Sequence, residues 1–275
     1  MEIIQPKKSL GQNFLVDRNI AQKIVNAIDL AEGDTIIEIG AGTGSLTSLL
    51  LNTEAHIISV EIDNRACEVL KTTFPIDKYP NFTLINENFL KLSISKFSQE
   101  NKKLKVIGNI PYNLSSEIFF KLFESHNVIS SAVLMIQKEL AQRLVSPPGN
   151  KQYGILSIAL KLVGEGKMLF DVNPGCFIPQ PKVTSTVIKF TFKNDNQNHD
   201  YFDIMKLVRL AFNQRRKMLR KSLEMYVKSH FENSDQPAIP DSVKKYFNLR
   251  AEQLSVDDFK TIFYSLKAMG NRKGE

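Results

Sequence analysis

The 275-residue sequence contains no tryptophan and only two cysteines, Cys67 and Cys176. The cysteines lie far apart and form no CxxC or Cys/His motif, so the sequence predicts neither a disulfide framework nor a bound metal. No run reaches the roughly 18 apolar residues of a membrane span, and no apolar stretch follows the first basic residues as in a signal peptide. These absences predict a cytoplasmic protein that does not span a membrane.

The remaining composition is that of a globular protein with an excess of basic residues. Hydrophobic residues make up 43% and charged residues 24% of the chain, which excludes extensive disorder and low-complexity character. The net charge of +7 is uneven, because residues 200–275 hold 15 basic and 10 acidic residues, whereas residues 1–199 hold 21 and 19. This excess predicts a polyanionic partner that the C-terminal part of the chain contacts.

Short apolar runs alternate with helical patterns through the first two thirds of the chain. The alternation is typical of βαβ units and predicts an α/β fold with a mostly parallel sheet. After the polar stretch KNDNQNHD, apolar residues recur at helical spacing. We therefore predict a larger α/β domain over residues 1–199 and a small helical domain over residues 200–275. The predicted strands are Thr35–Ile39, His56–Ile62, Phe82–Ile85, Leu104–Ile107, Ala132–Ile136, Met168–Phe170 and Thr184–Phe192.

A glycine-rich loop follows the first predicted strand in the pattern ExGxGxG, from Glu38 through Gly40, Gly42 and Gly44. Glycines at the carboxyl end of such a strand allow a tight turn and a close approach to a ligand. Glu61 ends the next strand, where a carboxylate can accept the ribose hydroxyls of an adenosine cofactor. The loop resembles that of S-adenosylmethionine-dependent methyltransferases; a plain tight turn and a nicotinamide dinucleotide site are the alternatives.

The tetrapeptide NIPY, residues Asn109, Ile110, Pro111 and Tyr112, ends another predicted strand. The Asn109 side-chain oxygen and the Ile110 carbonyl are two acceptors that can align the amino group of an adenine, and Pro111 restricts Ile110 to an extended conformation. Tyr112 offers a ring on which a flipped base can stack, a contact worth about 1–3 kcal/mol. The alternative interpretation is a turn that simply ends the strand.

The segments KKSLGQNFL, EIGAGTG, GNIPY and FIPQPKVTS follow one another along the chain. With these motifs in this order, the sequence resembles the rRNA adenine N6,N6-dimethyltransferases over essentially its whole length, and is most similar to the small-subunit branch. The resemblance implies a Rossmann-like methyltransferase fold with a seven-stranded, mostly parallel sheet. It also implies dimethylation of two adjacent adenosines in the 3′-terminal hairpin of 16S rRNA by a monomer, with S-adenosylmethionine as donor and the small ribosomal subunit or its precursor as partner.

The same resemblance assigns cofactor contacts. Gly40 and Glu61 would contact the methionine and ribose portions of the donor, and Asn88 would lie near its adenine, at a position where the family usually has aspartate. An amide keeps a carbonyl acceptor, so we expect donor binding to survive with altered affinity. The cofactor-binding residues predicted in total are Gln12, Asn13 and Leu15 in an N-terminal segment that covers the donor, with Gly40, Gly42, Gly44, Glu61, Asn88 and Asn109.

For the target adenine, the resemblance implies that Asn109 and Tyr112 hold the base. Phe177, in FIPQP, would close over the base from the other side. From the residues alone, an aromatic between prolines favours a core position for Phe177. The predicted catalytic residues are therefore Asn109, Ile110, Pro111, Tyr112 and Phe177.

A basic segment without any acidic residue runs from Lys206 to Lys221. At helical spacing, its apolar residues would face the protein and most of its cations would face outward, which favours contact with RNA phosphates over a merely solvated helix face. The predicted RNA-binding residues are Lys206, Arg209, Arg215, Arg216, Lys217, Arg220 and Lys221.

Three other functions compete with the small-subunit dimethyltransferase. The first is the 23S rRNA adenine N6-methyltransferase that confers macrolide resistance, which also carries NIPY but is less similar in the long helical C-terminal region. The second is a mainly non-catalytic factor in small-subunit assembly. The third is a DNA adenine methyltransferase, which usually has an acidic DPPY-type tetrapeptide where this chain has Asn109.

Overall fold

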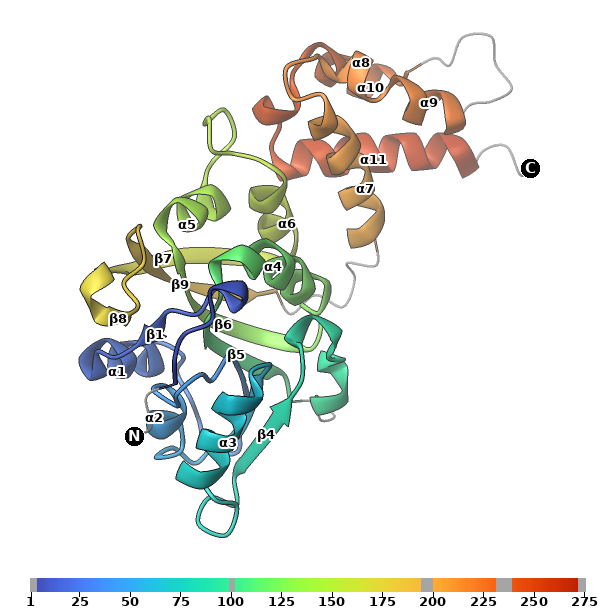
Figure 1. The fold of residues 1–275 in the computed structure, drawn as a ribbon. Coiled ribbons are helices and arrows are strands. Elements are labelled where there is room, and N and C mark those ends of the chain that lie inside the picture. Colours follow the sequence, from blue (N-terminus) through green and yellow to red (C-terminus); the bar gives the residue numbers. More distant parts are fainter. Residues whose placement is uncertain (1–3, 99–101, 194–199, 231–238, 272–275) are drawn as a thin grey trace. The chain divides into compact units, whose positions relative to one another are not determined.

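The structure is a computed structural model, which describes residues 4–98, 102–193, 200–230 and 239–271 (Figure 1). The chain forms two compact units: residues 1–142 with 164–195, and residues 143–163 with 196–275. The predicted domains differ from these units because residues 143–163 belong to the second one. Most of the predicted linker KNDNQNHD, residues 194–199, lies outside the described residues.

The first unit is built on a seven-stranded sheet with strand order β4-β3-β2-β5-β6-β9-β7. β4, β3, β2, β5 and β6 are parallel, while β9 runs antiparallel to both β6 and β7. This confirms the predicted mostly parallel sheet, and it brings the carboxyl ends of β2, β3 and β5 to one edge. The strands are β2 (Thr35–Ile39), β3 (His56–Glu61), β4 (Phe82–Asn86), β5 (Leu104–Asn109), β6 (Ile129–Gln137), β7 (Gly164–Val172) and β9 (Ser185–Phe192).

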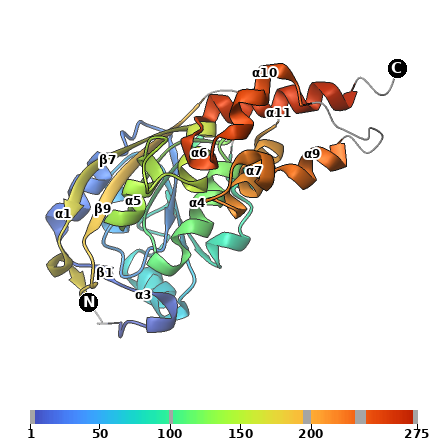
Figure 2. The ribbon, with the colours of Figure 1, turned by 90° about the horizontal axis from the view of Figure 1, so that it is seen from above.

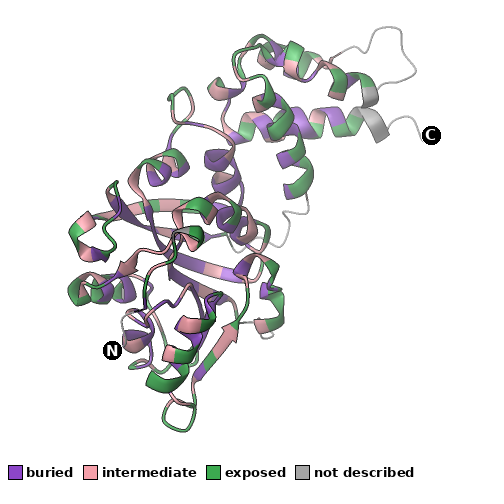
Figure 3. Ribbon diagram, viewed as in Figure 1, coloured by how far each residue is buried: buried purple, intermediate pink, exposed green. Residues whose placement is uncertain are grey.

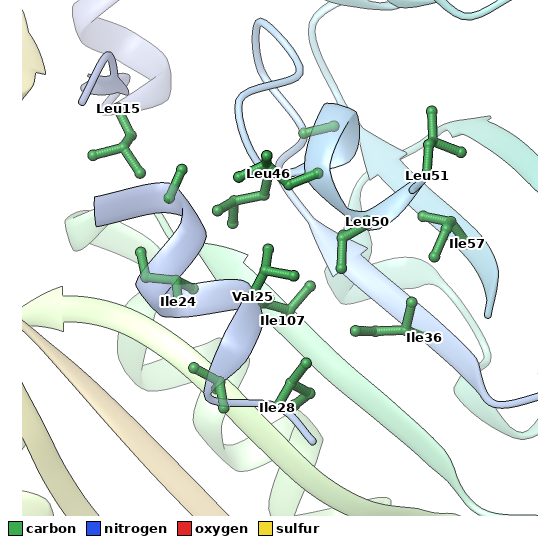
Figure 4. Packing of buried hydrophobic residues seen from close by; sticks show 14 of the residues in the cluster. Leu15, Ile24, Val25, Ile28, Ile36, Leu46, Leu50, Leu51, Ile57 and Ile107 are labelled. Atoms are coloured by element: carbon green, nitrogen blue, oxygen red, sulfur yellow. The ribbon is translucent and has the colours of Figure 1, made fainter. Parts of the chain in front are cut away.

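Helices cover both faces of this sheet. One face packs against α1, α2 and α3 through a single apolar cluster. Figure 4 shows Val25 of α1, and Ile28 just after that helix, on the side that faces Ile36 of β2. On the other face, Phe119 of α4 packs edge-on against Phe190 of β9, and Figure 2 shows α1 and α4 on opposite sides of the strands. The helices are α1 (Arg18–Asn26), α2 (Thr47–Leu50), α3 (Asn64–Thr73), α4 (Ser115–Glu124) and α5 (Lys138–Val145), with 3-10 turns at Lys8–Leu10, Phe89–Lys91, Ile94–Phe97, Tyr112–Leu114 and Pro174–Cys176.

A second, two-stranded sheet lies outside the main one. β1 (Phe14–Leu15) pairs antiparallel with β8 (Phe177–Ile178). These strands are too short to give a periodic signal, so the sequence did not predict them. Their pairing fixes the N-terminal segment next to the FIPQP loop.

The second unit is helical. Its elements are α6 (Ile155–Val163), α7 (Tyr201–Asn213), α8 (Leu219–Ser222), α9 (Glu224–His230), α10 (Asp241–Lys244) and α11 (Val256–Asn271), with 3-10 turns at Lys245–Asn248 and Ala251–Gln253. α6 is apolar on nearly all sides and almost entirely buried (Figure 3), and it packs against α7 and α11. The hydroxyl of Tyr153, just before α6, donates to the Leu254 carbonyl at 2.8 Å. These contacts explain why residues 143–163 join the helical unit.

The predicted basic helix over Lys206–Lys221 is wrong. α7 ends at Asn213, a turn follows, and α8 begins at Leu219. In the described parts of the chain, no helix is both long enough and apolar enough to cross a membrane.

Candidate functional site

The glycine loop leaves β2 with left-handed backbone at each of its three glycines. Gly40 (φ +72°) donates its N–H to the Val60 carbonyl at 2.8 Å. At Gly42 (φ +55°) a side chain would lie 3.0 Å from the Phe14 ring, and at Gly44 (φ +86°) it would lie 2.8 Å from the Phe74 ring. Both positions require glycine for the backbone and for space. Gly40 and Gly42 line a pocket at the sheet edge, whereas Gly44 does not and faces the Phe74 ring, so its predicted cofactor contact is not supported.

Glu61 ends β3 inside the same pocket and is 5% exposed. Its two carboxylate oxygens accept the backbone N–H groups of Gly42 and Asp63, each at 2.8 Å. Burial raises the pKa of Glu61, and the two N–H donors oppose that rise. The carboxylate is therefore fixed in orientation and keeps acceptor capacity toward the pocket.

Glu38 lies behind the glycine loop and is 1% exposed. Its Oε2 accepts from the hydroxyls of Thr47 at 2.7 Å and Ser59 at 2.5 Å, and burial raises the pKa of this carboxyl to about 7. The first glutamate of the ExGxGxG pattern does not line the pocket. Instead it ties the start of α2 to β3, on either side of the loop.

Asn109 and Ile110 supply two acceptors where β5 ends. The Asn109 amide donates from Nδ2 to the Asn13 carbonyl at 2.8 Å, which leaves Oδ1 as the remaining polar atom of this side chain. The Ile110 carbonyl accepts no hydrogen bond from any residue that the structure describes. Both residues line the pocket, as the amine-aligning hypothesis requires.

Tyr112 follows in the same pocket wall, after Pro111. Its hydroxyl lies 2.6 Å from Ser185 Oγ on β9, and burial raises the pKa of the phenol. The hydrogen bond fixes one end of the ring while the ring itself borders the pocket. Ser185 therefore contributes to the site indirectly, and no sequence motif indicates this contact.

Residues 10–14, here termed the cover segment, form another wall of the pocket. Gln12 Nε2 donates to Asp63 Oδ2 at 3.0 Å, and the Asn13 carbonyl accepts from Asn109. The cover segment thus joins the ends of β3 and β5. Leu15, predicted to contact the cofactor, is instead buried in the apolar cluster beside α1 (Figure 4).

Phe177 does not border the pocket either. It is 1% exposed, pairs with Leu15 across the β1–β8 sheet, and belongs to the same apolar cluster. This is the core position that the residues alone favour, and the closing of Phe177 over the target base stays a prediction.

Asn88 lines the pocket after β4 and caps the 3-10 turn Phe89–Lys91. Its Oδ1 accepts the Leu90 N–H at 2.9 Å, so the carbonyl acceptor expected near the donor's adenine already has one partner. Lys121 of α4 holds the same turn, because its Nζ donates to the Leu90 carbonyl at 2.8 Å.

The structure thus brings most predicted site residues into one pocket, together with apolar neighbours that the motifs did not identify. The predicted residues that line it are Gln12, Asn13, Gly40, Gly42, Glu61, Asn88, Asn109, Ile110, Pro111 and Tyr112; the additional ones include Phe14, Val60, Ile62, Phe89, Leu90 and Ile118. Most of the additional residues adjoin a motif or a strand end, which is the only signal that could have found them. Among the described residues, no group of three His, Cys, Asp or Glu side chains could hold a metal ion.

The predicted RNA-binding cations lie in the second unit. Six of the seven are exposed, and Arg215 is half-buried. Acidic residues outside the basic segment pair with three of them: Asp203 with Lys206 at 2.8 Å, Glu252 with Arg215 at 2.6 Å, and Glu224 with Lys221 at 3.8 Å. Within the described parts of the chain, Arg216, Lys217 and Arg220 form no ion pair.

Comparisons with known proteins identify the family of this chain. The family model for ribosomal RNA adenine dimethylase matches residues 3–267. Proteins named ribosomal RNA small subunit methyltransferase A are similar: that of Mycoplasma mobile is 38% identical over 94% of this chain and 98% of its own, and that of Chlorobaculum tepidum is 39% identical over 99% and 94%.

Two solved structures share the fold. A dimethyladenosine transferase from Plasmodium falciparum superposes with a TM-score of 0.79 at 28% identity, covering 95% of this chain and 98% of its own. The 23S rRNA methyltransferase ErmE gives a TM-score of 0.67 at 22% identity, covering 93% and 100%. The family match, which extends over both units, shows that this chain belongs to the ribosomal RNA adenine dimethylase family.

Proposed function

We propose that this protein transfers methyl groups from S-adenosylmethionine to the N6 amino groups of two adjacent adenosines in the 3′-terminal hairpin of 16S rRNA. The observation that carries the proposal is the arrangement of Asn109 Oδ1 and the Ile110 carbonyl beside Tyr112, in the pocket that also holds Glu61. The relatives are named as small-subunit rRNA methyltransferases, which supports 16S rRNA as the substrate.

The residues present fit the methyl donor. Two pocket glycines with left-handed backbone leave room for a ligand close to the chain, and the buried Glu61 carboxylate can accept hydroxyl groups of a ribose. S-adenosylmethionine supplies an electrophilic methyl group on a sulfonium whose thioether is a good leaving group. The protein's contribution is then to align the nucleophile rather than to provide a strong base.

The target nitrogen needs alignment because its lone pair is delocalised into the adenine ring. Two acceptors can each take one N–H of the amino group, which directs the lone pair out of the ring plane. The Tyr112 ring can stack on the extruded base and offset part of the few kcal/mol lost on unstacking. After the first transfer only one N–H remains, so the second transfer depends more on the stacking contact.

The exposed cations Arg216, Lys217 and Arg220 are suited to position the RNA through its phosphates. The partner would be the small subunit or its precursor, bound by a monomer in the cytoplasm. A 23S rRNA enzyme has less support, because the 22% identity to ErmE speaks to the fold alone.

The decisive experiment is mass-spectrometric mapping of methylated adenosines after incubation with S-adenosylmethionine and unmodified small or large subunits. We expect two adjacent dimethyladenosines near the 3′ end of 16S rRNA and none in large subunits. Asn109→Ala should abolish transfer but keep subunit binding, whereas Asn52→Ala, at an exposed amide that does not line the pocket, should keep both. Methylation of 23S rRNA, or normal subunit binding without transfer by the wild type, would replace this function with one of its rivals.

Tyr112 provides a test of the pocket itself. Tyr112→Ala should lower the ratio of dimethylated to monomethylated adenosine, since the second transfer loses its main contact. Tyr112→Phe keeps the ring and loses only the Ser185 hydrogen bond, so it should stay close to the wild type. An unchanged rate and product ratio in Tyr112→Ala would refute the stacking role.

A further inference from the structure

Asp63 is an unusually well-connected carboxylate near the pocket, and no motif points to it. It lies two residues beyond Glu61 and is 3% exposed. Its Oδ2 accepts from Gln12 Nε2 at 3.0 Å and from Arg65 Nη2 at 2.6 Å. Its Oδ1 accepts from Arg65 Nε at 3.1 Å and from the Arg65 N–H at 3.2 Å, which makes Asp63 the N-cap of α3.

The donors to Asp63 also hold the chain that leads into the cover segment. Gln12 Oε1 accepts the Lys7 N–H at 2.8 Å, and Arg65 Nη1 donates to the Gln5 carbonyl at 3.1 Å. The Lys7 ammonium lies 3.9 Å from Asp63 Oδ1. Residues 5–12 are therefore bound to the end of β3 both directly and through Arg65.

Asp63 also contacts Glu61, the residue proposed to bind the ribose of the donor. Its backbone N–H donates to Glu61 Oε1 at 2.8 Å, so one residue orients Glu61 with its backbone and Gln12 with its side chain. On the far side of the pocket, the Asn13 carbonyl is bound by Asn109. The cover segment is thus fixed at two strand ends, and Asp63 is the fixed point at β3.

We propose that Asp63 is a positioning residue that holds Gln12 of the cover segment, and the chain leading into that segment, at the end of β3 and thereby sets the affinity for S-adenosylmethionine. The inference rests on the proposed function, since it assumes that this pocket takes the methyl donor. The Arg65 guanidinium holds the pKa of Asp63 well below its ordinary value, so the carboxylate stays ionised across the neutral range. The Asp63 carboxylate therefore keeps its hydrogen bonds to Gln12 and Arg65 across the neutral pH range.

Asp63→Asn isolates this role. Asparagine caps a helix about as well as aspartate, so α3 keeps its cap through Oδ1. At the other position an NH₂ group would face two donors, Gln12 Nε2 and Arg65 Nη2, and both hydrogen bonds would be lost. Because bonds to a charged acceptor are among the stronger ones, we expect the Kd for S-adenosylmethionine to rise roughly tenfold.

The experiment combines calorimetric binding of S-adenosylmethionine, steady-state methylation of small subunits, and hydrogen exchange of the full chain. In Asp63→Asn, the KM for the donor should rise with Kd, kcat at saturating donor should stay within about twofold, and exchange should increase in residues 5–12. Asp34→Asn is the matched control, because Asp34 is also an ion-paired aspartate, 2.7 Å from Lys105, but precedes β2 at the opposite sheet edge. It should change none of these three quantities.

A second variant keeps the test decisive if Asp63→Asn folds poorly. Arg65→Met removes a partly exposed side chain that does not line the pocket and should weaken donor binding by about threefold. The double variant should bind the donor no more weakly than Asp63→Asn alone, because both changes break one network. Additive effects, or a normal Kd in Asp63→Asn, would overturn the role of Asp63, whereas a wild type that fails to bind S-adenosylmethionine would overturn the proposed function instead.

Discussion

Two adjacent arginines in the second unit allow a direct test of how this protein contacts RNA. Arg215 is committed within the protein: its Nε lies 2.6 Å from Glu252 Oε2, and its Nη2 donates to the Lys151 carbonyl at 2.6 Å. Arg216 is exposed and has no ion pair among the described residues. We therefore expect Arg216→Ala to remove a phosphate contact and Arg215→Ala to leave the number of such contacts unchanged.

The size of the effect follows from counterion release. Each phosphate contact contributes about 0.9 to the slope of log affinity against log salt for duplex nucleic acid, and about 0.7 for single strands. Across a fourfold increase, from about 50 to about 200 mM, one contact then accounts for about a threefold loss of affinity. Over this salt range, the loss of RNA affinity should thus be about threefold smaller for Arg216→Ala than for the wild type. Arg215→Ala should show the wild-type slope and a lower melting temperature, because it leaves Glu252 unpaired.

Fluorescence anisotropy with a labelled fragment of the 16S rRNA 3′ end measures the slope for each variant. Lys217→Ala and Arg220→Ala, which replace two further exposed and unpaired cations, should behave like Arg216→Ala. If all three variants keep the wild-type slope, these cations are a solvated surface and the RNA binds elsewhere. If Arg215→Ala flattens the slope as much as Arg216→Ala, the Glu252 ion pair opens on binding and the distinction between the two arginines is refuted.

Three further predictions concern buried or half-buried residues of the first unit. Burial raises the pKa of Glu38 from 4.5 to about 7, so between these pH values the folded protein holds a proton that the unfolded chain releases. The free energy of unfolding of the wild type, relative to that of Glu38→Gln, should therefore fall as the pH rises through this window, by at most ~3 kcal/mol. Urea unfolding at both ends of the window checks this, and a pH-independent difference would contradict it. Phe177→Ala should cost about 3–5 kcal/mol of stability, while Phe177→Leu should largely keep both fold and methylation; a well-folded but inactive Phe177→Leu would support the base-contact hypothesis. Asn88→Asp keeps the hydrogen bond that caps Leu90 and adds a second carboxylate acceptor, so calorimetry should show several-fold tighter binding of the donor. Unchanged or weaker binding would show that residue 88 does not face the adenine amino group of the donor.

The main sheet was predictable because its strands are buried on both faces. Ile36, Ile37 and Ile39 of β2 are all buried, so the strand appears in the sequence as an apolar run, interrupted only by the buried Glu38 and bounded by polar residues and glycine. All seven predicted strands are present, with ends shifted by a few residues. Because parallel strands place their carboxyl ends together, the motifs that follow β2, β3 and β5 had to meet at one edge.

The basic segment shows where local pattern fails. Its apolar spacing fits one continuous helix, yet the backbone turns between Asn213 and Leu219, and Leu219 donates its N–H to the Leu249 carbonyl. The acids that pair with its cations also lie outside the segment, at Asp203, Glu224 and Glu252. The break and the Arg215–Glu252 pair depend on tertiary contacts, whereas Asp203 and Glu224 pair locally from three residues beyond either end of the sixteen-residue window that suggested the helix.

The pocket combines both situations. One part of its lining consists of residues at strand ends that sequence motifs identify, namely Gly40, Glu61 and Asn109. Its closure depends on bonds between residues far apart in the chain, such as Gln12 with Asp63 and Asn13 with Asn109. A sequence motif identifies residues that contact the ligand directly. Asp63 acts only through Gln12 and Glu61, so it belongs to no motif. Substitution of Asn109, which is proposed to face the target amino group, should therefore affect the chemical step. Substitutions that break the closure should instead affect donor affinity, and the comparison of Asn109→Ala with Asp63→Asn separates these two roles within one pocket.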